Sequence, residues 1–158
     1  PAPFLWYPMA VLLRPGLTIT SWAEANDAKY RWGVTLGSSS DANLSRHASK
    51  SQITRFQDVN AMYAAFQSNR VDGIFSLGPS LDLVRTKLGA GTLKVLTPRG
   101  ALAAGVAIRQ ESDQRFKSYL TTCINYFYSG GQTQAAYHEF LKFRGVDPAD
   151  ASPIIKES

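Results

Sequence analysis

The chain has 158 residues, of which 44% are hydrophobic and 18% are charged. This length and composition suffice for one well-buried core, and they exclude an intrinsically disordered or fibrous protein. Lys and Arg outnumber Asp and Glu by 17 to 12, which gives a net charge of +5. Because the basic side chains are scattered and not interleaved with aromatics, the sequence favours a solvated basic surface over a nucleic-acid partner.

The single cysteine and the short apolar stretches exclude further classes of protein. Cys123 is the only cysteine, so no disulfide can form within the chain, and no Cys or His spacing predicts a metal or cofactor site. No apolar stretch approaches the roughly 20 residues that span a bilayer, so we expect no direct insertion into a membrane. The chain begins at Pro1 without an initiator Met or a signal peptide, and we expect a processed product or a fragment.

The first predicted elements are a strand over residues 9–13 and a turn over 14–16, where Pro and Gly interrupt regular pairing. Ser21 and Glu24 have the spacing of a capping box, which predicts a short helix over 21–27.

A second strand is predicted over residues 32–36, and Gly37 ends it. The side chains that follow are of the kinds that cap helices, namely Ser38, Ser39, Ser40 and Asp41. They predict a helix that continues toward His47, and the whole segment is a strand, glycine turn and helix.

Two more strand–helix pairs follow. Strands are predicted over residues 53–56 and 71–77, with Asp58 capping one helix and Pro79 in the first turn of the other. Apolar residues recur at helical spacing in both helices: Val59, Met62, Tyr63 and Phe66 in the first, and Leu81, Val84 and Leu88 in the second.

The last predicted strands cover residues 93–96 and 105–108, and two helices over 113–128 and 133–143 complete the chain. Alternating strands and helices predict an α/β domain, with a mostly parallel sheet flanked by helices on both faces.

In such sheets, ligands bind where strands end and helix N-termini expose free amide groups. Two segments have this position, the turn Ser38–Asp41 and the pair Ser76 and Leu77. The turn could hold a carboxylate, sulfonate or phosphate. The alternative is that its serines only cap a helix.

Enzyme signatures are poor, and we predict no catalytic residue. The serines lack the GxSxG elbow, and His138 lacks the second histidine of an HExxH motif. His47 and His138 are interpreted as surface or helix-face residues, and Cys123 is interpreted as a core residue.

Four segments resemble, in order, motifs of the type II periplasmic solute-binding proteins, in the polar amino acid binding family of ABC importers. They are VLLRPGLTITSWAEA, RWGVTLGSSSD, NRVDGIFSL and GVAIRQESDQRF, and the Gly130-Gly131 break resembles the turn between that family's last helices. The match runs from about Met9 to Gly145.

The resemblance implies a two-lobed periplasmic receptor that closes on a small solute, a carboxylate or another anion, and delivers it to a membrane permease. It assigns the solute carboxylate to Ser38, Ser39 and Ser40, and it assigns the hinge to Leu13, Arg14, Ala107 and Ile108. Their position at the strand ends adds Asp41, Ser76 and Leu77 to the predicted ligand-binding residues. The resemblance divides the chain into a crossover or first-lobe remnant (1–8), hinge strands and second lobe (9–110), C-terminal helices (111–145) and a tail (146–158).

Leu77 departs from the family pattern, which has an acidic residue there for the ammonium of an amino acid. Because a buried ammonium needs a charged partner, we expect either an anion without an amine or an amine that the other lobe holds.

Other functions on the same fold stay open. They are a dehydratase-like enzyme with Asp41 as its acid or base, an effector or sensor domain of a regulator, and an accessory protein of a periplasmic dehydrogenase.

Overall fold

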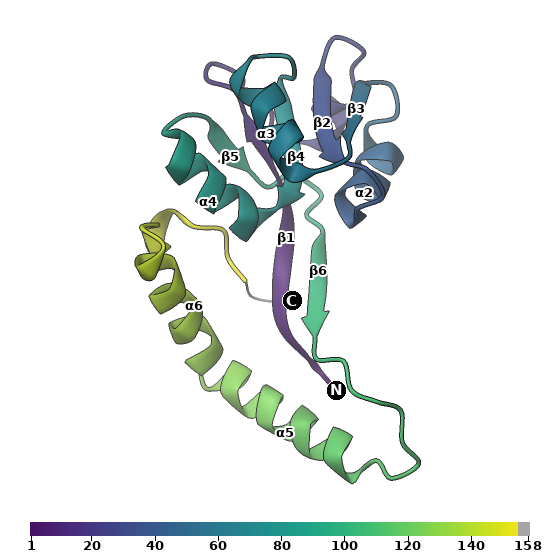
Figure 1. Ribbon diagram of the computed structural model, residues 1–158, viewed down its shortest axis with the longest axis vertical. Coiled ribbons are helices and arrows are strands. Elements are labelled where there is room, and N and C mark those ends of the chain that lie inside the picture. Colours follow the sequence, from purple (N-terminus) through teal and green to yellow (C-terminus); the bar gives the residue numbers. More distant parts are fainter. Residues whose placement is uncertain (155–158) are drawn as a thin grey trace. The chain divides into compact units, whose positions relative to one another are not determined.

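The computed structural model describes residues 1–154, and the chain divides into two compact units. The lobe unit is Pro8–Gly100, and the helical unit joins Pro1–Tyr7 to the chain from Ala101 onward. Figure 1 shows the strands and helices of each unit.

The lobe unit is built on a sheet with the strand order β3-β2-β4-β1-β5. Its strands are residues 8–13 of β1 (Pro3–Leu13), β2 (Arg31–Thr35), β3 (Gln52–Phe56), β4 (Gly73–Leu77) and β5 (Thr92–Lys94). Strand β2 pairs in parallel with β3 and β4, whereas β1 pairs antiparallel with β4 and β5.

The α/β class with helices against the sheet is confirmed, but the sheet is mixed and not mostly parallel. A strand pairs in parallel with its neighbour only if a long crossover carries the chain back to the starting edge. Between β1 and β2 the only helix is α1 (Trp22–Ala25), which has four residues. The chain therefore enters β2 in the direction opposite to β1.

Helices α1 and α2 (Ser39–His47) contribute to one core, and α3 (Val59–Gln67) and α4 (Gly78–Leu88) contribute to another. The two cores use alternate residues of the same strands, since successive side chains of a strand point to opposite faces. Val11, Leu13 and Phe75 belong to the α1–α2 core, and Leu12 and Ile74 belong to the α3–α4 core. Strand β1 is thus buried on both faces within the lobe unit, as its unbroken apolar run requires.

The helical unit holds β6 (Ala101–Gly105), α5 (Arg115–Ser129), α6 (Gln132–Phe143) and the short helix η1 (Pro148–Asp150). Strand β6 pairs with β1, and α5 packs against α6 after the turn at Gly131, whose φ is +80°. The predicted strand over 105–108 is wrong, because β6 ends at Gly105. The strand forms earlier in the chain, over the small residues that pair with β1, and not over the apolar run that follows them.

The segment from residue 146 onward is not a loose tail over its described part. Val146 and Ile154 are buried, and the N–H of Trp6 donates to the carbonyl of Ile154 at 3.1 Å. Apolar burial and a backbone hydrogen bond both hold a segment in place. The predicted tail also includes residues 155–158, which lie outside the described residues.

Candidate functional site at the carboxyl edge of the sheet

Three parallel strands end at the same edge of the lobe sheet, and a helix begins after each. Thr35 pairs with Phe56, and Gly33 pairs with Ile74, so β2, β3 and β4 run side by side to this edge. Helices α2, α3 and α4 start there, and α2 lies against β4. The predicted turn Ser38–Asp41 and the predicted pair Ser76 and Leu77 therefore belong to one edge, where α/β sheets bind ligands.

Ser38 caps α2. Its hydroxyl accepts the N–H of Asp41 at 3.1 Å and donates to the carbonyl of Thr35 at 2.7 Å. The N–H of Ser38 also donates to the Thr35 carbonyl. The hydroxyl and amide of Ser38 are thus committed to the turn itself, which is the capping role that its sequence position predicts.

Ser39 and Ser40 are the first two helical residues of α2, where amide groups have no partner within the helix. Within residues 1–154, no acceptor takes the N–H of Ser39 or Ser40, and neither hydroxyl has a hydrogen-bond partner. Ser39 is exposed, whereas Ser40 is 5% exposed. Two unpaired amides at the positive end of a helix form a local anion-binding element.

Asp41 is a buried residue in the first turn of α2, and its carboxylate accepts three hydrogen bonds. Its carboxylate accepts the N–H of Gly37 at 3.0 Å, the hydroxyl of Ser45 at 3.2 Å and Nε of Arg55 at 2.8 Å. Burial acts to raise the pKa of Asp41, but the Gly37 amide and the Arg55 guanidinium together lower it below its usual value. Asp41 is therefore ionised at neutral pH.

Arg55 was not predicted from the sequence as part of this site. It lies in β3 opposite Val34, and its Nη2 also donates to the Ser45 hydroxyl at 2.7 Å. The pairing of β2 with β3 brings it to Asp41, 14 residues earlier in the chain. Its position in a strand near a helix with an acid in its first turn was the only local signal, and the strand register had to be known to use it.

Ser76 and Leu77 end β4 and are half-buried, opposite Ala10 and Met9 of β1. Leu77 is the N-cap of α4 and offers no side-chain hydrogen bond to the helix. Neither residue supplies a carboxylate, so this segment has no charged partner for an ammonium group.

The residues predicted as the hinge lie in different settings. Leu13 is buried and pairs with Gly73 and Thr92, while Arg14 forms an ion pair with Asp72 at 3.0 Å. The chain passes between its two units after Tyr7 and after Gly100.

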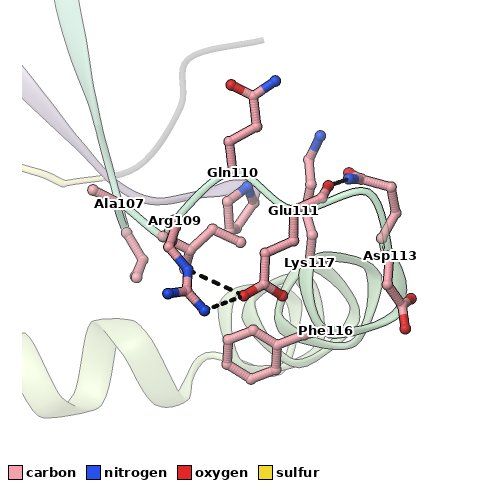
Figure 2. Close-up of a pocket in the computed structure, with 11 residues that line it drawn as sticks. Ala107, Arg109, Gln110, Glu111, Asp113, Phe116 and Lys117 are labelled. Carbon is pink, nitrogen blue, oxygen red and sulfur yellow. Dashed lines mark hydrogen bonds and ion pairs between the residues drawn. The ribbon is translucent and has the colours of Figure 1, made fainter.

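Ala107 and Ile108 follow β6 and line a pocket of about 830 Å³ in the helical unit. Figure 2 shows this pocket, with the ion pair between Arg109 and Glu111 at its wall. The hinge role of all four residues stays a prediction.

The remaining chemical candidates have packing contacts. The His47 ring lies against the Trp22 ring with the centroids 5.1 Å apart and the planes tilted by 33°. Cys123 is only half-buried in α5, so its interpretation as a core residue is wrong. In the part of the chain that the structure describes, no three His, Cys, Asp or Glu side chains gather as metal ligands would. No helix within residues 1–154 is long and apolar enough to cross a bilayer.

Neither a family model nor a curated protein matches the sequence. Solved structures do match. An ancestral cationic amino acid solute binding protein has a TM-score of 0.73 and 19% identity, over 87% of this chain and 59% of that one. A second structure of that ancestral protein describes it as an amino acid-binding precursor of cyclohexadienyl dehydratase.

Two further matches are also described as proteins that bind amino acids or serve their transport. The cysteine-binding protein of Campylobacter jejuni has a TM-score of 0.69 and 17% identity, over 99% of this chain and 62% of that one. The substrate binding protein of an amino acid ABC transporter has a TM-score of 0.62 and 11% identity, over 89% and 62%. The chain spans about three fifths of the length of these proteins. The fold that the sequence motifs predict is therefore confirmed: the chain has the fold of the matching part of these amino acid-binding proteins.

Proposed function

We propose that this chain is the ligand-binding lobe of a periplasmic solute-binding protein, which holds a small carboxylate-bearing solute for an ABC-type importer. The carrying observation is the pair of unpaired amides of Ser39 and Ser40 at the carboxyl edge of the sheet. A carboxylate at this position would accept both N–H groups and the hydroxyl of Ser40. Ser38 contributes by holding the helix start in place.

The solute class follows from what surrounds the turn. Ser76 and Leu77 carry no acid, and the carboxylate of Asp41 is already occupied by Arg55 and the Gly37 amide. This edge therefore favours the carboxylate end of a solute over an ammonium end. Any amine of the solute would be held by the part of the receptor beyond this chain, since similar proteins are longer.

A dehydratase is the second candidate, because one similar protein is described as a dehydratase precursor. Acid–base catalysis needs a group that exchanges protons near neutral pH. Asp41 is the acid at this turn, and its pKa is held low by its hydrogen bonds. We therefore favour binding without catalysis. If the protein turned over a substrate and the Asp41→Asn variant did not, the dehydratase would be favoured instead.

A proline substitution tests the proposed amide contact. Proline is tolerated at the first helical position and removes one N–H, and the extended backbone of Ser38 (φ −76°, ψ 164°) accommodates a following proline. In the receptor that carries this chain, we expect Ser39→Pro to weaken binding of the best ligand from a panel of L-amino acids and dicarboxylates. The loss should be roughly tenfold or more, because a charge-assisted hydrogen bond disappears. Calorimetric titration measures it.

Two controls accompany this variant. Ser39→Ala keeps the N–H and should change affinity by less than about threefold. Val59→Pro removes the equivalent amide of α3, whose next two amides are already capped by the Asp58 carboxylate, and it should leave affinity unchanged. Equal affinities of Ser39→Pro and the wild type would refute the amide contact.

A further inference from the structure

The turn Ser38–Asp41, called the serine turn below, contains a fixed negative charge that opposes the binding of an anion. Asp41 lies one residue after Ser40, and its carboxylate reaches back to the N–H of Gly37 at 3.0 Å. A ligand carboxylate on the amides of Ser39 and Ser40 would therefore lie close to a like charge. Asp41 is 8% exposed, so water screens this repulsion poorly.

Arg55 supplies the opposite charge at the same place. Its Nε lies 2.8 Å from the Asp41 carboxylate, and its Nη2 lies 2.7 Å from the hydroxyl of Ser45. These two bonds hold the guanidinium against α2, and the Arg55 side chain is 40% exposed. Asp41 and Arg55 together carry no net charge, which leaves the helix N-terminus free to attract an anion.

We infer that Arg55 sets the charge preference of the serine turn by neutralising Asp41, and that it acts as a positioning residue rather than as a ligand contact. The inference rests on the proposed function. Without Arg55, the uncompensated Asp41 charge repels a carboxylate. Without the charge of Asp41, the surplus charge of Arg55 attracts one. Ser40 is 5% exposed and its hydroxyl has no partner within residues 1–154, so this hydroxyl is available to donate to the anion.

Four variants of the 158-residue chain test the inference with acetate as the probe. Chemical shifts of the Ser39 and Ser40 amides report the dissociation constant. We expect Arg55→Gln to raise it roughly tenfold, which corresponds to about 1.4 kcal/mol. Arg55→Lys, which keeps the charge, should stay within about threefold of the wild type.

The other two variants separate charge from shape. Asp41→Asn keeps an oxygen acceptor for the Gly37 amide and should bind acetate more tightly than the wild type. The double variant Asp41→Asn with Arg55→Gln should return to within about twofold of the wild type, because both charges are absent. In 0.5 M salt, the effect of Arg55→Gln should shrink, since exposed charges are screened.

The possible failures are distinguishable. If acetate causes no saturable shift at Ser39 and Ser40 of the wild-type chain, the proposed function and this inference fall together. If acetate binds the wild type and Arg55→Gln alike, the inference alone is wrong. A double variant that stays as weak as Arg55→Gln would also overturn it, since Arg55 would then act by shaping the turn.

Discussion

Asp72 links the ends of β1, β2 and β4 on the side of the lobe sheet opposite the serine turn. It precedes β4, and its buried carboxylate contacts Arg14 at 3.0 Å and Nη2 of Arg31 at 2.9 Å. It also accepts the backbone N–H of Arg31 at 2.9 Å. Burial acts to raise the pKa of Asp72, and its contacts with Arg31 and Arg14 lower it further than burial raises it.

A carboxyl group whose pKa is lower in the folded than in the unfolded state stabilises the fold above its unfolded pKa. The stabilisation is lost as the pH falls through the folded pKa. We expect Asp72→Asn to lower the free energy of unfolding at pH 7 by about 2 kcal/mol, because the two arginines lose their charged partner. The deficit should begin to narrow as the pH falls below the ordinary Asp pKa of about 4, and it should narrow further as the pH falls through the lower folded pKa of Asp72.

Urea unfolding of both proteins from pH 7 to pH 3 measures this difference. Other acids, Asp41 included, titrate in both proteins and cancel in the comparison. A deficit that stays constant across this range would show that the charge of Asp72 does not stabilise the fold.

At the scale of elements, α2 begins where it does because of one side chain. The hydroxyl of Ser38 accepts the N–H of Asp41 and donates to the carbonyl of Thr35. We expect Ser38→Ala to lower the free energy of unfolding by about 1 kcal/mol, the usual cost of losing a helix cap. Ser39→Ala, which removes an unpaired exposed hydroxyl, should change it by less than about 0.5 kcal/mol. Chemical denaturation compares the two variants, and equal costs would contradict the assigned cap.

The elements that could be predicted from the sequence are those whose causes are local. The side chains of Ser21, Ser38 and Asp58 each accept a backbone N–H from the first turn of the helix that they cap. About four consecutive residues therefore suffice to predict where each helix starts. The αL conformation of Gly89 ends α4 in the same local way.

What could not be predicted depends on pairing. The run Val106–Ile108 is more apolar than Ala101–Gly105, yet β6 forms from the latter because β1 is its partner. The antiparallel direction of β1 and the contact of Arg55 with Asp41 depend equally on register. Val146 and Ile154 are buried without any periodic pattern that would have marked them. The serine turn was predictable, whereas the charge balance around it was not.

At the scale of the whole molecule, the two units differ in how much they bury. Strand β1 contributes Val11, Leu12 and Leu13 to the lobe unit as fully buried residues. In contrast, α5 has no buried residue over its 15 positions, and Phe116 and Tyr119 are exposed. Local stability follows the apolar contacts that an element makes.

We therefore expect amide hydrogen exchange to separate the units. The amides of α5 should exchange at least about 100-fold faster than those of the β1–β4 ladder, because little burial opposes local opening of α5. Exchange followed by NMR on the 158-residue chain measures both sets together. Equal protection would mean that the chain opens as one cooperative body.

The proposed function depends on the amides of Ser39 and Ser40 holding a carboxylate. A crystal structure of this chain grown in acetate is the decisive experiment. We expect an acetate carboxylate within about 3 Å of both nitrogens, with the Asp41–Arg55 ion pair intact beside it. A structure in which acetate avoids this turn, or in which Asp41 closes over both amides, would refute the proposed contact.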